Sequence, residues 1–162
     1  MRPEVVHADA TASPDPAPSR GSLILIVEDN GTNALILRAM LRKSGYETMV
    51  AVDGNEGVEM TRRLRPCLVL MDLHMPRLDG FAAAAEIRRS CPGDAPPIVA
   101  VTANANPEVH AACLASGFRA VLSKPILLDA LIATVREFVP PPPSATAPAN
   151  RSPVSLSRSR KS

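Results

Sequence analysis

The sequence has no long hydrophobic run. No apolar stretch reaches the roughly 18 residues that a membrane-spanning helix needs, and no signal-peptide core follows Met1. Cysteine is also scarce: Cys67, Cys91 and Cys113 are scattered and form no Cys-x-x-Cys pair, so neither a disulfide framework nor a zinc site is indicated. We therefore expect no membrane insertion and a location in the reducing cytoplasm.

The sequence also lacks a strong excess of one charge in its middle part. The whole chain has a net charge of +2. Residues 140–162 carry four basic residues and no acid, and residues 1–21 carry two basic and three acidic residues, which leaves −1 for residues 22–139. This middle part is not a basic nucleic-acid surface, and no helix-turn-helix segment is evident outside it. We expect no direct binding to nucleic acid.

Proline is abundant but unevenly placed. Of the 17 prolines, four lie in residues 1–20 and six in residues 140–162. The periodic apolar segments lie almost entirely between these two regions. We therefore predict disordered tails at residues 1–21 and 140–162, around a single domain at residues 22–139.

Short apolar segments alternate with longer amphipathic ones in the middle of the chain. The short segments read as strands buried on both faces, and they are residues 23–27, 48–52, 67–71, 98–101 and 119–122. The longer segments predict helices at residues 30–44, 54–65, 80–90, 107–117 and 126–139. Gly45 is suited to the end of the first of these helices, and Pro107 to the start of the fourth.

Five repeats of strand and helix predict an α/β fold. The chain should form a doubly wound, five-stranded parallel sheet with right-handed crossovers and helices on both faces. Ligands of such open sheets bind beyond the carboxyl ends of the strands. The residues that follow each strand are therefore the candidates for a functional site.

Polar side chains follow four of the five predicted strands. Glu28 and Asp29 follow the first strand, Asp72 the third, Thr102 ends the fourth, and Lys124 follows the fifth. Each of these residues alone would be ordinary, as a helix-start acid, a turn hydroxyl or a surface lysine. Four strand ends that carry such groups in one fold predict a common site.

Three carboxylates at one sheet edge repel one another by a few kcal/mol, and a divalent cation relieves this repulsion. Hard oxygen ligands that are too few for a complete cage suit Mg²⁺, which leaves positions for phosphate oxygens. The Lys124 ammonium and the Thr102 hydroxyl can both contact a phosphate. Asp72, which is central in the predicted strand order, is the candidate nucleophile for aspartyl-phosphate chemistry.

Four motifs together resemble the receiver domain of response regulators. They are ILIVEDN, LVLMDLHMPRLDG, IVAVTANAN and VLSKPI, in the family's order and at similar separations between Leu23 and about Val139. The details of these motifs resemble receivers of hybrid histidine kinases and single-domain regulators more than receivers fused to DNA-binding domains. The resemblance implies a flavodoxin-like (βα)5 fold.

The resemblance also implies a role for each site residue. Asp72 would accept a phosphoryl group from a phosphohistidine on a sensor histidine kinase or a histidine phosphotransfer protein. Mg²⁺ would be held by the side chains of Asp29 and Asp72 and by the backbone carbonyl of His74, with Glu28 acting through a metal-bound water. Lys124 would hold the phosphoryl oxygens.

Further residues would control the switch and its lifetime. Thr102 would turn toward the phosphate, and the peptide between Lys124 and Pro125 would be cis. Many receivers carry an aromatic residue three positions before the lysine, where this chain has Val121 and the nearest aromatic residue is Phe118. We therefore expect the signal to use the Thr102 loop and the fourth helix.

By the same resemblance, His74 and Asn104 would flank the path of the hydrolytic water and tune the dephosphorylation rate. Without an output or kinase segment in the sequence, we expect a stand-alone regulator, not an enzyme, that acts on an unknown downstream protein. One alternative is a degenerate receiver that binds partners without phosphate. The other is a haloacid-dehalogenase-like phosphatase, which would need a second aspartate where His74 stands.

Overall fold

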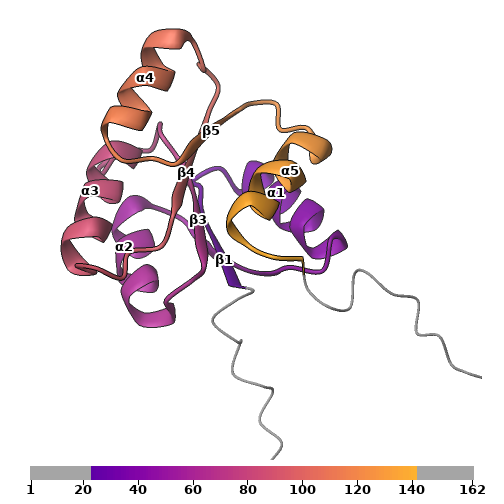
Figure 1. The fold of residues 1–162 in the computed structure, drawn as a ribbon, viewed down its shortest axis with the longest axis horizontal. Helices are drawn as coiled ribbons and strands as arrows, with labels where there is room; N and C mark the ends of the chain where they lie inside the picture. Colours follow the sequence, from indigo (N-terminus) through magenta and orange to yellow (C-terminus); the bar gives the residue numbers. More distant parts are fainter. Residues whose placement is uncertain (1–22, 142–162) are drawn as a thin grey trace, which may run out of the picture.

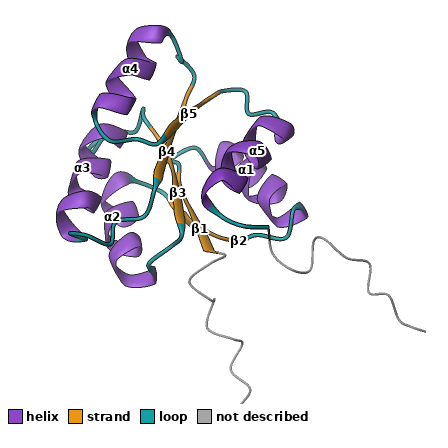
Figure 2. Ribbon diagram, in the orientation of Figure 1, coloured by secondary structure: helices purple, strands orange, loops and turns teal. Residues whose placement is uncertain are grey.

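Five parallel strands form the centre of the protein in a computed structural model, which describes residues 23–141. The strands are β1 (Leu23–Val27), β2 (Glu47–Ala51), β3 (Leu68–Asp72), β4 (Ile98–Thr102) and β5 (Ala120–Ser123). Their order across the sheet is β2-β1-β3-β4-β5, and all neighbouring pairs are parallel (Figure 2). Strand β3 therefore lies in the middle, as predicted for the strand that carries Asp72.

Five helices cover the two faces of this sheet. They are α1 (Gly31–Lys43), α2 (Gly54–Leu64), α3 (Gly80–Ser90), α4 (Pro107–Ala115) and α5 (Leu128–Phe138). Figure 1 shows α1 and α5 on one face and α2, α3 and α4 on the other. The predicted doubly wound α/β fold is confirmed.

The hydrophobic core consists of two layers, one on each face of the sheet. Alternate residues of a strand point to opposite faces, so Leu25 and Val27 pack toward α2 and α3, whereas Ile24 and Ile26 pack toward α1 and α5. All five residues of β1, β3 and β4 are buried. The uninterrupted apolar runs of these three strands follow from burial on both faces.

The two edge strands differ from the prediction. The sequence predicted burial on both faces for all five strands, which was wrong for β2 and β5. On β2 only Ala51 is buried and Met49 is 43% exposed, and on β5 only Leu122 is buried. The helices pack over the centre of the sheet, so its margins are only partly covered.

Local signals in the sequence set the ends of the helices. Four helices begin at a capping side chain that accepts a hydrogen bond from a backbone N–H three residues later, namely Asn30, Asp53, Asp79 and Asn106. Helix α1 ends at a Schellman motif, in which Gly45 has φ +88° and the Tyr46 N–H donates to the Leu41 carbonyl. Observed and predicted element ends differ by at most two residues, as is usual.

Both predicted tails, residues 1–21 and 140–162, lie outside the described residues apart from Pro140 and Pro141. Between residues 23 and 141, none of the helices has the length and apolar character needed to cross a membrane.

Candidate functional site

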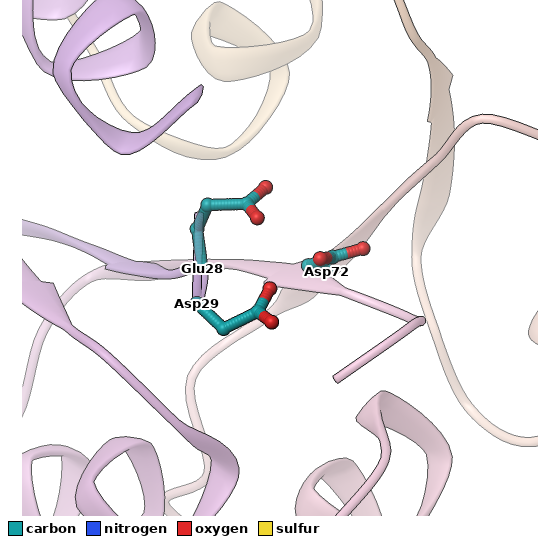
Figure 3. Close-up of side chains that lie close together, drawn as sticks. All are labelled: Glu28, Asp29 and Asp72. Carbon is teal, nitrogen blue, oxygen red and sulfur yellow. The ribbon is translucent and has the colours of Figure 1, made fainter. Parts of the chain in front are cut away.

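The carboxyl ends of β1 and β3 bring three acidic side chains together. These strands are direct neighbours with Val27 opposite Met71, so the residues that follow lie side by side. Glu28, Asp29 and Asp72 each place a carboxylate oxygen within 4.8 Å of the others (Figure 3). Glu28 and Asp72 are only 2% and 3% exposed, whereas Asp29 is exposed.

Lys124 reaches this acidic cluster from β5. Its Nζ lies 3.0 Å from Glu28 Oε2 and 3.5 Å from Asp72 Oδ1. The Lys124 N–H donates to the Thr102 carbonyl at 2.8 Å, and the Lys124–Pro125 peptide is cis. A single ammonium therefore faces two buried carboxylates across the end of β4.

The electrostatics of the cluster are most evident at Glu28. Burial raises the pKa of its carboxyl, the Lys124 ammonium and the Asn30 N–H oppose this rise, and nearby Asp72 adds to it. Glu28 Oε1 accepts the Asn30 N–H at 3.1 Å, and Oε2 faces the Lys124 ammonium at 3.0 Å. The site holds more negative charge than one lysine balances.

The loop after β3 holds Asp72 in place. Asp72 Oδ1 accepts the His74 N–H at 3.1 Å, and the Leu73 N–H continues the ladder by donating to the Val101 carbonyl at 3.2 Å. Gly80 packs directly on this loop, because a Cβ on Gly80 would lie 2.4 Å from the Asp72 carbonyl oxygen. The side chain of His74 is exposed.

Thr102 ends β4 beside the cluster and is fully buried. Its hydroxyl accepts the Asn104 N–H at 3.1 Å, so in this state it is engaged within its own loop. Val121 is half-buried on β5, while Phe118 is buried and packs edge-to-face on Phe81 with ring centroids 5.6 Å apart. No aromatic ring therefore occupies position 121.

The residues fit a hard divalent cation. Three carboxylates with oxygens this close offer the ligand type that Mg²⁺ prefers, in a number that leaves positions for water and phosphate. The sequence predicted that Glu28, Asp29, Asp72 and Lys124 meet at this edge, and the structure brings them together there. The sequence did not predict the Glu28–Lys124 ion pair or the close packing of Gly80. The Asp79–Gly80 pair in the sequence is typical of a turn, and it does not indicate that Gly80 packs on the loop after β3.

The sequence was compared with protein families and with known proteins. Residues 24–136 match the family described as response regulator receiver domain. The chain is 35% identical over 112 residues to PilH of Pseudomonas aeruginosa, which covers 69% of the chain and 93% of PilH. It is 42% identical over 117 residues to the peroxide stress-activated histidine kinase mak1 of Schizosaccharomyces pombe, covering 68% of the chain but only 7% of mak1.

Many solved structures share the fold, and two of them are relevant to the site. One is the receiver domain of the sensor histidine kinase PA1611 of Pseudomonas aeruginosa, with a magnesium ion in its active-site cleft (TM-score 0.67, 38% identity, 73% of this chain and 97% of that one). The other is the receiver domain of Ssk1 in complex with the phosphotransfer protein Ypd1 of Saccharomyces cerevisiae (TM-score 0.67, 34% identity, 73% and 88%). The chain therefore belongs to the response regulator receiver domain family of two-component and phosphorelay signalling.

Proposed function

We propose that the chain is a stand-alone response regulator that accepts a phosphoryl group on Asp72. The observation that supports this most strongly is the cluster of three carboxylates within 4.8 Å of one another, faced by a single ammonium. A surface salt-bridge network would place such groups in water, but here Glu28 and Asp72 are almost fully buried. Burial of unbalanced charge is costly and points to a functional use.

The residues of the site would act by position and charge. Asp72 Oδ1 accepts the His74 N–H, and the other carboxylate oxygen would attack phosphorus. Lys124 would release part of its contact with Glu28 and bind the incoming phosphoryl oxygens. Little chemistry is asked of the protein beyond orientation and charge neutralisation.

Mg²⁺ would be bound by the side chains of Asp29 and Asp72 and by the His74 carbonyl, with Glu28 acting through a water. When bound, it would neutralise negative charge during transfer. The magnesium ion in the related PA1611 receiver supports this assignment.

The phosphoryl donor would be a sensor histidine kinase or a histidine phosphotransfer protein. The Ssk1–Ypd1 complex supports a partner of the second kind, and the alignment with nearly all of PilH supports a regulator of one domain. The output would be the binding of a downstream protein rather than catalysis.

Phosphorylation takes the Asp72 side chain from about −1 toward −2, which biases a two-state arrangement of loop and helix. We expect the Thr102 hydroxyl to leave the Asn104 N–H, from which it is now 3.1 Å away, and to turn toward the phosphate. The switch would then pass to α4 without an aromatic side chain at Val121. His74 and Asn104 would set the lifetime of the phosphorylated state.

The deciding experiment is incubation with Mg²⁺ and acetyl phosphate, followed by intact-mass measurement. Wild type should gain about 80 Da, the mass of one phosphoryl group. Asp72→Asn should gain nothing, whereas Asp129→Asn, which changes an exposed carboxylate on α5, should behave as wild type. If wild type stays unmodified yet binds a partner, the chain is a degenerate receiver. Release of inorganic phosphate from many substrate molecules would favour a phosphatase of the haloacid-dehalogenase type.

A further inference from the structure

Two arginines line a pocket at the end of the sheet opposite to the acidic cluster. The pocket has a volume of about 360 Å³ and lies where α3 and α5 end and β4 and β5 begin. Its lining includes Arg88, Arg119, Pro96, Pro97, Glu137 and Phe138. We call it the Arg88–Arg119 pocket.

Arg88 is held in this pocket by the turn before β5. Gly117 has φ +90°, and a Cβ on it would lie 2.7 Å from Arg88 Nη1, so the guanidinium occupies the space that this glycine leaves free. Nη1 is buried and has no hydrogen-bonding partner among residues 23–141. Because Nη1 is closed off, a ligand in the pocket would meet the remaining, accessible part of this half-buried side chain.

Arg119 is positioned by different contacts. Its guanidinium carbon lies 5.8 Å from the centroid of the Phe138 ring, in a cation–π arrangement, and its backbone N–H donates to the Ile98 carbonyl. In the described part of the chain, neither arginine has a carboxylate within 4.0 Å, although Glu137 lines the same pocket. Neither guanidinium group therefore has a carboxylate partner among the described residues, and Arg119 is exposed.

A second pocket shares part of its lining with the first, and we call the two pockets together the groove. The second pocket has a volume of about 450 Å³, lies between the ends of α2 and α3, and shares Ala95, Pro96 and Pro97 with the first pocket. Arg62 and Arg65 line it, and Arg65 makes only an exposed ion pair of 3.6 Å with Asp94. The shared prolines offer apolar surface without N–H donors, with arginines on either side.

We propose that this groove binds an acidic, extended segment of a partner protein, with one carboxylate in the Arg88–Arg119 pocket. Carboxylates form charge-assisted, often bidentate hydrogen bonds with guanidinium groups, so they suit the exposed Arg119 and the accessible part of the half-buried Arg88. Apolar residues between the acids would pack on Pro96 and Pro97. The acids Asp94 and Glu137 beside the arginines disfavour a uniformly charged polymer such as nucleic acid.

The test is fluorescence anisotropy with a labelled octapeptide of alternating glutamate and proline, at low salt and without phosphodonor. Arg88→Gln and Arg119→Gln should each weaken binding about tenfold, and the double variant more. Arg38→Gln changes an exposed arginine on α1 and should leave the affinity unchanged. Thermal unfolding of each variant checks that the fold is retained.

Three outcomes would overturn the proposal. The first is equal affinity for a peptide of alternating glutamine and proline. The second is an equal loss of affinity in Arg38→Gln, which would indicate attraction to net charge alone. The third is tighter binding of a single-stranded oligonucleotide of the same charge with the same dependence on Arg88 and Arg119, which would mark a nucleic-acid surface instead.

Discussion

The two ends of the sheet carry opposite charges. At the carboxyl edge, where the helices begin, Glu28, Asp29 and Asp72 converge on one lysine. At the amino edge, where the helices end, basic residues occupy the last turns of four helices: Arg42 and Lys43 on α1, Arg62 and Arg63 on α2, Arg88 and Arg89 on α3, and Arg136 on α5. The net charge of −1 for the middle of the chain conceals this separation.

Burial is what distinguishes the two edges. Basic residues at helix ends complement the helix dipoles, and exposed ones contribute about 0.3 to 1 kcal/mol each at low salt. The carboxylates of Glu28 and Asp72 are instead almost fully buried, and Asp72 is the last residue of a strand and not part of a helix start. Burying these two carboxylates side by side lowers the stability of the fold. Their placement is therefore better explained by function than by folding.

Two glycines allow the packing of the edges to be compared. Gly80→Ala should lower the free energy of unfolding by about 3 kcal/mol, because the new Cβ would meet the backbone of Asp72 and Leu73, which cannot move aside. Gly117→Ala at the amino edge should cost about 1 kcal/mol, since only the left-handed backbone is strained and the tip of Arg88 can shift. Urea unfolding measures both.

Gly31→Ala is the control for these two substitutions, because its Cβ would meet nothing within 4 Å. It should change stability by less than about 0.5 kcal/mol. A Gly80→Ala protein as stable as Gly31→Ala would show that the loop after β3 is not tightly packed.

The second prediction removes one cation from each edge. Lys124→Met should destabilise the protein by about 2 kcal/mol near neutral pH, since it leaves Glu28 and Asp72 buried without a counter-charge. Arg62→Met at the amino edge should cost less than about 0.5 kcal/mol, because Arg62 has no ion pair in the described part of the chain. If the two variants lost equal free energy of unfolding in urea, burial would not be what distinguishes the two edges of the sheet.

The sequence was most informative where one physical constraint dominated. The run from Leu68 to Met71 is apolar because β3 is buried on both faces, and this alone indicated a central strand that ends in Asp72. Parallel strands then required the strand-end residues to meet, so the convergence of Glu28, Asp29 and Asp72 followed without coordinates.

Features that depend on side-chain direction and on the packing of several elements could not be predicted in this way. The pairing of Lys124 with Glu28 depends on how far a side chain from β5 reaches across β4. The Thr102 hydroxyl can accept a hydrogen bond within its own loop, as it does here from the Asn104 N–H, or it can contact a phosphate. The sequence alone does not indicate which of the two it does. The Arg88–Arg119 pocket requires the ends of α3 and α5 to meet the starts of β4 and β5, and no motif in the sequence marks it.

The third prediction concerns Mg²⁺ and the exposed member of the cluster. Asp29→Asn should raise the stability of the metal-free protein by at most about 1 kcal/mol, because it removes one of three like charges within 4.8 Å. Wild type should gain about 1.4 kcal/mol when Mg²⁺ is present at ten times its dissociation constant, and the variant much less at that concentration. The order of stabilities should therefore reverse on adding Mg²⁺ and return with a chelator.

If Mg²⁺ stabilised both proteins equally, Asp29 would not be a ligand. Sodium chloride at matched ionic strength is the control, because general screening weakens repulsion in the same direction.

The smallest expected effect is a pH dependence that arises from Glu28. Burial raises the pKa of its carboxyl above the ordinary 4.5, so the folded protein holds this proton more tightly than the unfolded chain does. Stability from this group is therefore complete below about pH 4.5 and declines as the pH rises through the folded-state pKa. Glu28→Gln cannot titrate, so the free energy of unfolding of wild type minus that of the variant should fall across this window.

In a Lys124→Met background the decline should extend to higher pH, since the ammonium opposes the rise in the pKa of Glu28. Urea unfolding at intervals from about pH 4 to pH 8 measures the difference in free energy of unfolding between wild type and variant. A difference that stays flat or rises with pH would contradict a Glu28 pKa raised by burial.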